Sequence, residues 1–355
     1  MTRRVYIDWL RGIAVLCMIE WHVLDAWSVP DGRDTVAWAV IRTFGGVAAP
    51  LFLFLAGIAV PLAGDARLRR GDSAAAAARA LQKRGWQIVA LAHLFRLQSF
   101  LLNTGASWHA ILKPDILNVL GLGLVATAVV WGRARQRDPA HRWLWWMAPV
   151  AVVLALTPWA PHWWWPTLLH PRLEAYVRPV DGWGVFTLFP AVAFVVAGAW
   201  VGEAMISNRT ADREPALHRR LGLAGLGLVG AGMAVGVAPL LMPSLRAWTP
   251  DLAQFAWRTG TLLLMIWGAY AWTRRVPRDP SDAIVTFGRT SLVVYWVHVE
   301  LAYGLVSYPL HRALPLEVSL AGLLIVTVLM LVLARWWDGR RPGPVVPAHM
   351  SATDG

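Results

Sequence analysis

The sequence predicts an all-α fold: a polytopic integral membrane helix bundle with about ten transmembrane helices and both termini in the cytoplasm. Three observations predict it. Of the 355 residues, 57% are hydrophobic and only 15% are charged, whereas soluble domains are about one-quarter charged. Apolar stretches of about 20 residues, the length that spans a bilayer, recur along the whole chain. Lys and Arg residues are also frequent in every second connection between these stretches and scarce in the others.

Each expected span is a predominantly apolar segment, and turn signals such as Pro-Asp-Gly at 30–32 separate neighbouring segments. The expected spans are Ile7–Trp27, Trp38–Ala63, Trp86–Leu102, Asp115–Trp131, Trp143–Ala160, Trp183–Met205, Leu221–Met242, Gln254–Trp272, Ile284–Ser307 and Ser319–Trp337.

The basic residues indicate how the predicted spans are oriented in the membrane. With the N-terminus in the cytoplasm, most of the 33 Lys and Arg residues fall in inner connections, where membrane proteins carry their positive excess. The net charge of +12 therefore reports topology, so we expect the lipid bilayer as a partner and no nucleic acid. We expect one domain over residues 1–340 and a short cytoplasmic tail over 341–355.

Several function classes are excluded by motifs that the sequence lacks. Cys17 is the single cysteine, which permits neither an internal disulfide nor a cysteine-based zinc site. The chain has no Walker motif, no dinucleotide-binding glycine pattern and no HExxH motif, and we expect no metal. The informative residues are the ionisable ones inside the spans, because they are costly in hydrocarbon and mark functional sites.

The first span holds four such residues on one broad stripe: Asp8, Arg11, His22 and Asp25. Arg11 and His22 fall within about 20° of each other around the helix and about 16 Å apart along it. Asp25 follows His22 at i+3, a spacing that lets a carboxylate orient an imidazole for general base catalysis. The alternatives are an Asp8–Arg11 ion pair that anchors the inner interface and a histidine that is merely hydrogen-bonded within the bundle.

The ninth span places Ser291, Tyr295 and His298 on one face, since they recur at i, i+4 and i+7. They are candidates for substrate binding, and an interhelical hydrogen bond is the alternative for His298. Two arginines are isolated candidates. Arg96 in the third span could line the same cavity, and Arg258 near the outer end of the eighth could meet an anionic acceptor.

Three segments resemble the transmembrane acyltransferase superfamily. Arg11, ten residues and then His22 resemble the Arg-x10-His signature of the acyltransferase-3 family. Residues 48–57 resemble its second helix, and residues 287–298 resemble its late Gly-Arg-x-Ser-Leu…Tyr…His segment. The chain is most similar to the bacterial branch related to heparan-α-glucosaminide N-acetyltransferase, which implies a multi-pass protein of the bacterial inner membrane.

The resemblance implies transfer of an acyl group from cytoplasmic acyl-CoA, most simply acetyl-CoA, to a sugar or glycan hydroxyl or amine presented from the outer side. His22, oriented by Asp25, would be the base. Arg11, Arg84 and Arg96 would bind the coenzyme, and Ser291, Tyr295, His298 and Arg258 the acceptor. The connection over 28–37 contains no histidine, which favours direct transfer over an acetyl-histidine intermediate.

A transporter or proton-coupled exporter is the alternative from another class, since buried charges could line a substrate path. No inverted repeat is visible in the sequence, and no paired Gly- or Pro-broken helices lie near the midplane. The oligomeric state, including a homo-oligomer, is left open.

Overall fold

The computed structural model describes residues 4–102, 108–138, 141–181, 186–242, 249–276 and 282–340, together with the single positions 244, 246 and 279. All of its longer regular elements are helices, and an isolated bridge joins Ser28 to Leu314. The expected tail over 341–355 lies outside the described residues.

Eleven α-helices are formed by the described residues. They are α1 (Val5–Trp27), α2 (Val36–Leu68), α3 (Ala74–Leu102), α4 (Ile116–Ala134), α5 (Arg142–Leu156), α6 (Pro171–Val177), α7 (Leu188–Ser207), α8 (Arg213–Leu241), α9 (Thr249–Arg275), α10 (Ala283–Tyr303) and α11 (Leu316–Gly339).

The all-α prediction is confirmed, and every predicted span falls on one of these helices; only the short α6 has no predicted counterpart. Five helices are long and apolar enough to cross a membrane: α2, α4, α7, α8 and α11. The other predicted spans, and the location of the termini, stay predictions. In α1 the charged residues of the polar stripe lower the apolar content that such a span requires.

Helices α1 and α10 pack in parallel, and two glycines set how closely they approach. A Cβ atom on Gly12 would lie 1.8 Å from the carbonyl oxygen of Ile284, and one on Gly288 would lie 1.8 Å from that of Asp8. No other residue type fits at such a contact, so the two backbones touch directly. This crossing fixes α10 against α1 although the two helices are far apart in the sequence.

Glycines also allow other helix pairs to approach closely. Gly57 of α2 and Gly198 of α7 each face the backbone of the opposite helix, with a Cβ atom at about 2 Å from a carbonyl oxygen. Gly85 of α3 and Gly121 of α4 meet in the same way in an antiparallel pair. Small residues at these positions therefore permit close helix packing.

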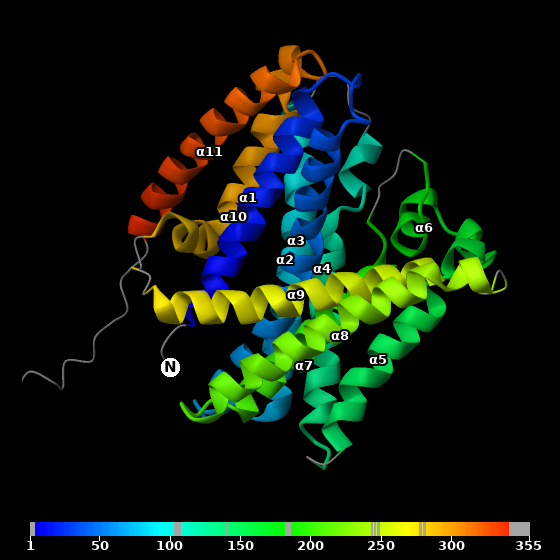
Figure 1. Ribbon diagram of the computed structural model, residues 1–355, viewed down its shortest axis with the longest axis vertical. Helices are drawn as coiled ribbons and strands as arrows, with labels where there is room; N and C mark the ends of the chain where they lie inside the picture. Colours follow the sequence, from blue (N-terminus) through cyan, green and yellow to red (C-terminus); the bar gives the residue numbers. More distant parts are fainter. Residues whose placement is uncertain are drawn as a thin grey trace, which may run out of the picture.

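The arrangement is a bundle crossed by a helical pair. In Figure 1, α1, α2, α3 and α10 run alongside one another, α11 flanks them, and α9 runs across this group with α8 beside it. The α8–α9 pair is antiparallel, and Gly225 faces the Gly260 region of α9. The first turns of α1 pack against the C-terminal part of α9, where the rings of Tyr6 and Tyr270 meet edge to face with centroids 5.6 Å apart.

Candidate functional site

A pair of histidines joins α1 to α10 ten residues beyond the glycine crossing. Nδ1 of His22 lies 2.8 Å from Nε2 of His298, and the two rings are nearly parallel. His298 is fully buried, whereas His22 is partly exposed. The interhelical hydrogen bond, which the sequence left as one alternative for His298, is therefore present, and its partner is the histidine predicted to be the base.

The hydrogen bonds fix which ring nitrogens carry protons when both rings are neutral. Nδ1 of His298 lies 2.7 Å from the carbonyl oxygen of Val294. A carbonyl only accepts, so this nitrogen donates and Nε2 of His298 is an acceptor. His22 must then donate from Nδ1, which leaves the lone pair on its own Nε2. The chain of bonds therefore sets the tautomer that a general base requires.

The second ring nitrogen of His22, Nε2, forms no hydrogen bond with a described residue. The ring of Tyr303, which is 41% exposed, meets the His22 ring edge to face with centroids 5.6 Å apart. Tyr303 therefore borders the His22 ring on one side, while His298 occupies Nδ1.

Asp25 does not orient His22 as the i+3 spacing suggested. Its carboxylate accepts a hydrogen bond from Arg33 at 2.9 Å and another from the Tyr303 hydroxyl at 3.1 Å. Arg33 also donates to the carbonyl oxygens of Asp25 and Ser28, both at 2.9 Å. Arg33 binds the Asp25 carboxylate because it lies in the connection that follows α1 and turns back over the end of that helix. By hydrogen bonds, Asp25 is linked to the surroundings of His22 through Tyr303.

Backbone contacts hold the C-terminal end of α1 in place. The N–H of Arg312 donates to the carbonyl oxygen of Ala26, and the N–H of Leu314 donates to that of Trp27. The indole of Trp27 donates to the carbonyl oxygen of Ala302, at the end of α10. These bonds satisfy carbonyls that a helix end leaves free, and they fix the turn of α1 that follows His22.

The other two predicted acceptor residues of α10 lie on the same helix with different surroundings. Tyr295 is buried and packs edge to face on His298, with centroids 5.9 Å apart. Ser291 is half-buried. Buried as it is, His298 contacts His22 and not open space. Its predicted role as a substrate-binding group stays a prediction.

A second polar centre surrounds the opposite end of α1. A pocket of about 870 Å³ opens beside Arg11, and a large share of its lining is charged. Arg4, Arg209 and Arg274 line it together with the Arg11 side chain, against the two carboxylates of Asp8 and Glu214. Arg11 pairs with Asp8 at 3.2 Å, as one alternative anticipated. The pocket is nevertheless cationic overall.

The other two arginines expected to bind the coenzyme do not line this pocket. Arg84 is exposed on α3 and donates to Gln87. Arg96 lies farther along α3 and pairs with Asp115 at 3.4 Å, at the start of α4. The sequence missed Arg4, Arg209 and Arg274 as pocket residues because they come from three segments that only the packing of α1 and α9 brings together.

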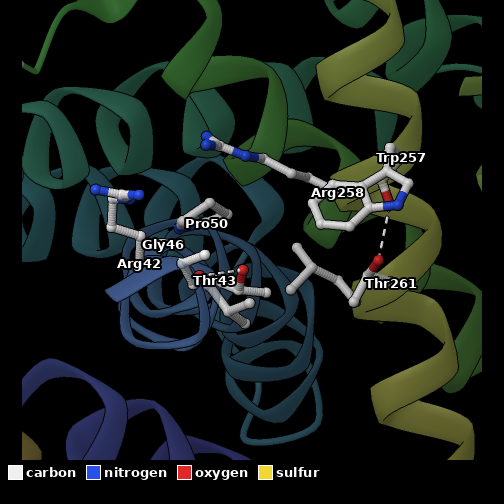
Figure 2. A pocket seen from close by; sticks show the side chains of 10 residues that line it. Arg42, Thr43, Gly46, Pro50, Trp257, Arg258 and Thr261 are labelled. Carbon is white, nitrogen blue, oxygen red and sulfur yellow. Dashed lines mark hydrogen bonds between the residues drawn. The ribbon is translucent and has the colours of Figure 1, made fainter. Parts of the chain in front are cut away.

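Arg258 is also separate from the histidine pair. It lies on α9 and lines a smaller pocket between α9 and α2, together with Arg42 (Figure 2). The predicted acceptor residues are thus divided between two places: Ser291, Tyr295 and His298 on α10, and Arg258 on α9.

One continuous helix connects the basic pocket to the histidine pair. Arg11 and His22 both belong to α1, and they lie about 16 Å apart along its axis. These features define a class: an apolar helical membrane protein with a hydrogen-bonded histidine pair inside the bundle and a cationic pocket at the other end of the same helix.

Comparison with known families gives the particular assignment. The family model described as heparan-alpha-glucosaminide N-acetyltransferase, catalytic, matches residues 3–233. This is well over half of the chain, and the chain belongs to this family. The match includes Arg11 and His22, whereas His298 lies beyond it. The resemblance to membrane acetyltransferases is thereby confirmed. The comparison with curated proteins finds no match.

Proposed function

We propose that the protein transfers an acetyl group from acetyl-CoA directly to a hydroxyl or amine of a sugar or glycan, with His22 as the general base. The observation that carries the proposal is the hydrogen-bond chain from Val294 through His298 to His22, because it leaves the lone pair on Nε2 of His22. A neutral imidazole with one free nitrogen is the usual group for removing a proton at physiological pH.

The reaction needs one proton transfer in each direction. His22 Nε2 takes the proton from the acceptor hydroxyl or amine as its oxygen or nitrogen attacks the thioester carbonyl carbon. The tetrahedral intermediate then expels the thiolate, and the C–S bond breaks. His22 returns the proton to the sulfur, so the products are the acetylated acceptor and coenzyme A. His298 stabilises the transient imidazolium because its Nε2 accepts the hydrogen bond from His22 Nδ1.

The basic pocket at Arg11 is our candidate for the nucleotide of the coenzyme. Phosphates are bound by arginine, whose planar guanidinium offers several donors. With the nucleotide in this pocket, the long pantetheine arm would have to extend about 16 Å along α1 to bring the thioester to His22. On the predicted topology the pocket faces the cytoplasm and His22 lies near the outer side, where a glycan would arrive.

Release of coenzyme A thiol by the purified protein tests the proposal. Supplied with acetyl-CoA and an amino sugar, the wild type should release thiol and form the acetylated sugar. His22→Ala should bind acetyl-CoA normally and lose turnover by at least about 100-fold, the usual contribution of a general base. His141→Ala is the matched control, because His141 is exposed and remote from α10. Wild-type turnover in His22→Ala would overturn the role of His22, and absence of transfer to every sugar acceptor tried would overturn the activity.

A further inference from the structure

The pocket between α2 and α9 is not used by the proposed reaction, and its composition is unusual. It has a volume of about 280 Å³ and is lined by two arginines, Arg42 and Arg258, with no acidic residue in its lining. Figure 2 shows Arg258 reaching from α9 toward α2, with its guanidinium on the same side of the pocket as that of Arg42.

Neither arginine is neutralised within the described part of the chain. Arg42 donates to the carbonyl oxygen of Arg33 at 2.8 Å, which leaves its charge uncompensated. Arg258 is half-buried and has no ion pair with a described residue. Arg42 is exposed, whereas Arg258 is half-buried. A cation that is partly withdrawn from water without a counter-charge is destabilising, so Arg258, with a second uncompensated arginine in the same pocket, favours an anion there.

The two threonines of the pocket do not compete for this role. Thr43 donates its hydroxyl proton to the carbonyl oxygen of Ala39, and Thr261 donates to that of Trp257. Their protons are thus used within their own helices. The guanidinium groups are the donors left for a ligand, and their planar fork matches the oxygens of a phosphate.

The surroundings of the pocket are apolar and exposed. Phe44, which follows Thr43 on α2, is 56% exposed, and Val40 on the same helix is 49% exposed. Trp257 of the pocket lining is itself 38% exposed. In a membrane protein such side chains contact lipid chains, and arginines with aromatic residues are typical of the level of the lipid headgroups. The pocket therefore joins a phosphate-binding pair to a surface for acyl chains.

We propose that this pocket binds the phosphate of an anionic membrane lipid, with Arg42 and Arg258 holding the headgroup and the exposed face of α2 beside Phe44 contacting the acyl chains. On the predicted topology both helices begin at the outer side of the membrane, so the lipid belongs to the outer leaflet. The inference does not depend on acetyl transfer, and it is tested by binding alone.

Native mass spectrometry of the delipidated protein, titrated with phosphatidylglycerol or phosphatidylcholine, measures this binding. The wild type should prefer phosphatidylglycerol by about tenfold or more, since the quaternary ammonium of phosphatidylcholine would lie beside two arginines and such like-charge juxtaposition is unfavourable. The preference should be lost in Arg258→Gln and in Arg42→Gln, and largely kept in Arg258→Lys. Arg219→Gln, which removes an exposed arginine of α8, should behave as wild type.

A second variant blocks the pocket and leaves both arginines in place. Gly46 lines the pocket, and a Cβ atom at this position would meet nothing within 4 Å. Gly46→Leu should therefore fill the space and abolish the preference, whereas Gly227→Leu, at an equally open position on α8, should not. Circular dichroism should show the same helix content in all variants.

Three results would overturn the proposal. They are equal binding of the two lipids by the wild type, a preference that survives in both Arg258→Gln and Gly46→Leu, and complete displacement of phosphatidylglycerol by inorganic phosphate. The last result would assign the pocket to a soluble phosphate, because inorganic phosphate makes none of the apolar contacts.

Discussion

His22 and His298 are separated by 276 residues and bonded at 2.8 Å, and the glycines at positions 12 and 288 have the same separation in sequence. The two helices therefore run in parallel and in register from the glycine crossing to the histidine pair. A shift of α10 by one residue along α1 would break both contacts. The close backbone contact at one end therefore sets the geometry of the histidine pair at the other.

Gly288→Ala should separate the helices and disable the site from a distance. The new Cβ atom would overlap the carbonyl oxygen of Asp8, and overpacking of this kind costs about 1–3 kcal/mol or more. We expect a lower melting temperature and loss of acetyl transfer. Gly268→Ala is the control, since a Cβ atom there meets nothing within 4 Å, and it should be neutral or slightly stabilising. If Gly288→Ala has normal activity, the contact between α1 and α10 at the glycines does not control the geometry of the histidine pair.

His298→Ala should lower kcat by about 100-fold or more and leave KM for acetyl-CoA nearly unchanged, because His298 orients the base and touches no substrate. Nitrogen NMR of the labelled His22 ring should show a proton fixed on Nδ1 in the wild type and a mixture of tautomers in the variant. His298→Gln should recover part of the rate if its amide oxygen accepts the bond from His22. A purely structural role would lower stability without changing the His22 tautomer.

Arg11→Gln and Arg274→Gln should weaken acetyl-CoA binding, because both residues line the basic pocket. Each lost contact to a phosphate should raise the dissociation constant by about tenfold, and added salt should reduce the difference. Arg84→Gln is a matched comparison, since Arg84 was predicted from the sequence to bind the coenzyme but is exposed outside this pocket. Calorimetric titration with acetyl-CoA distinguishes binding in the basic pocket from binding at Arg84. A loss of affinity in Arg84→Gln alone would favour the site at Arg84.

Arg33→Gln should destabilise the turn between α1 and α2. The Arg33 side chain bonds the Asp25 carboxylate and backbone carbonyls at the end of α1, and it lies over the ring of Trp38. We expect a loss of about 2–3 kcal/mol in unfolding free energy, the usual value for hydrogen bonds to charged groups, measured as a lower melting temperature. Arg219→Gln should have no such effect. A shift confined to activity would show that Arg33 acts on the reaction and not on the turn.

The helices themselves could be predicted from the sequence, because apolar length and turn residues are local signals. The crossing of α8 and α9 over the bundle could not, since it depends on which glycine faces meet, for example Gly225 against Gly260. The segment over Ala74–Ala78 lies before the predicted third span, and it forms the first turns of α3. Its alanines continue a helix regardless of where an apolar span begins.

The sequence predicted several residues of the candidate site, but not which of them bond to one another. Helical spacing placed Arg11 and His22 on one stripe, yet it cannot name a partner on another helix. An interhelical hydrogen bond was therefore one alternative for His298, without His22 as its named partner. The same limit explains Asp25, whose partner Arg33 lies in the turn. Tyr303 was missed altogether, because a residue five positions after His298 lies about 140° away from it around a helix.

The pairing of α1 with α10 also has a consequence during synthesis of the chain. At roughly 5–20 residues per second, roughly 14–55 s pass between the emergence of His22 and that of His298 from the ribosome. Throughout this interval the charged first helix must reside at the membrane without its final partner. A nascent chain, or one that stops before residue 298, therefore has no assembled base, and acetyl transfer should begin only once translation is nearly complete.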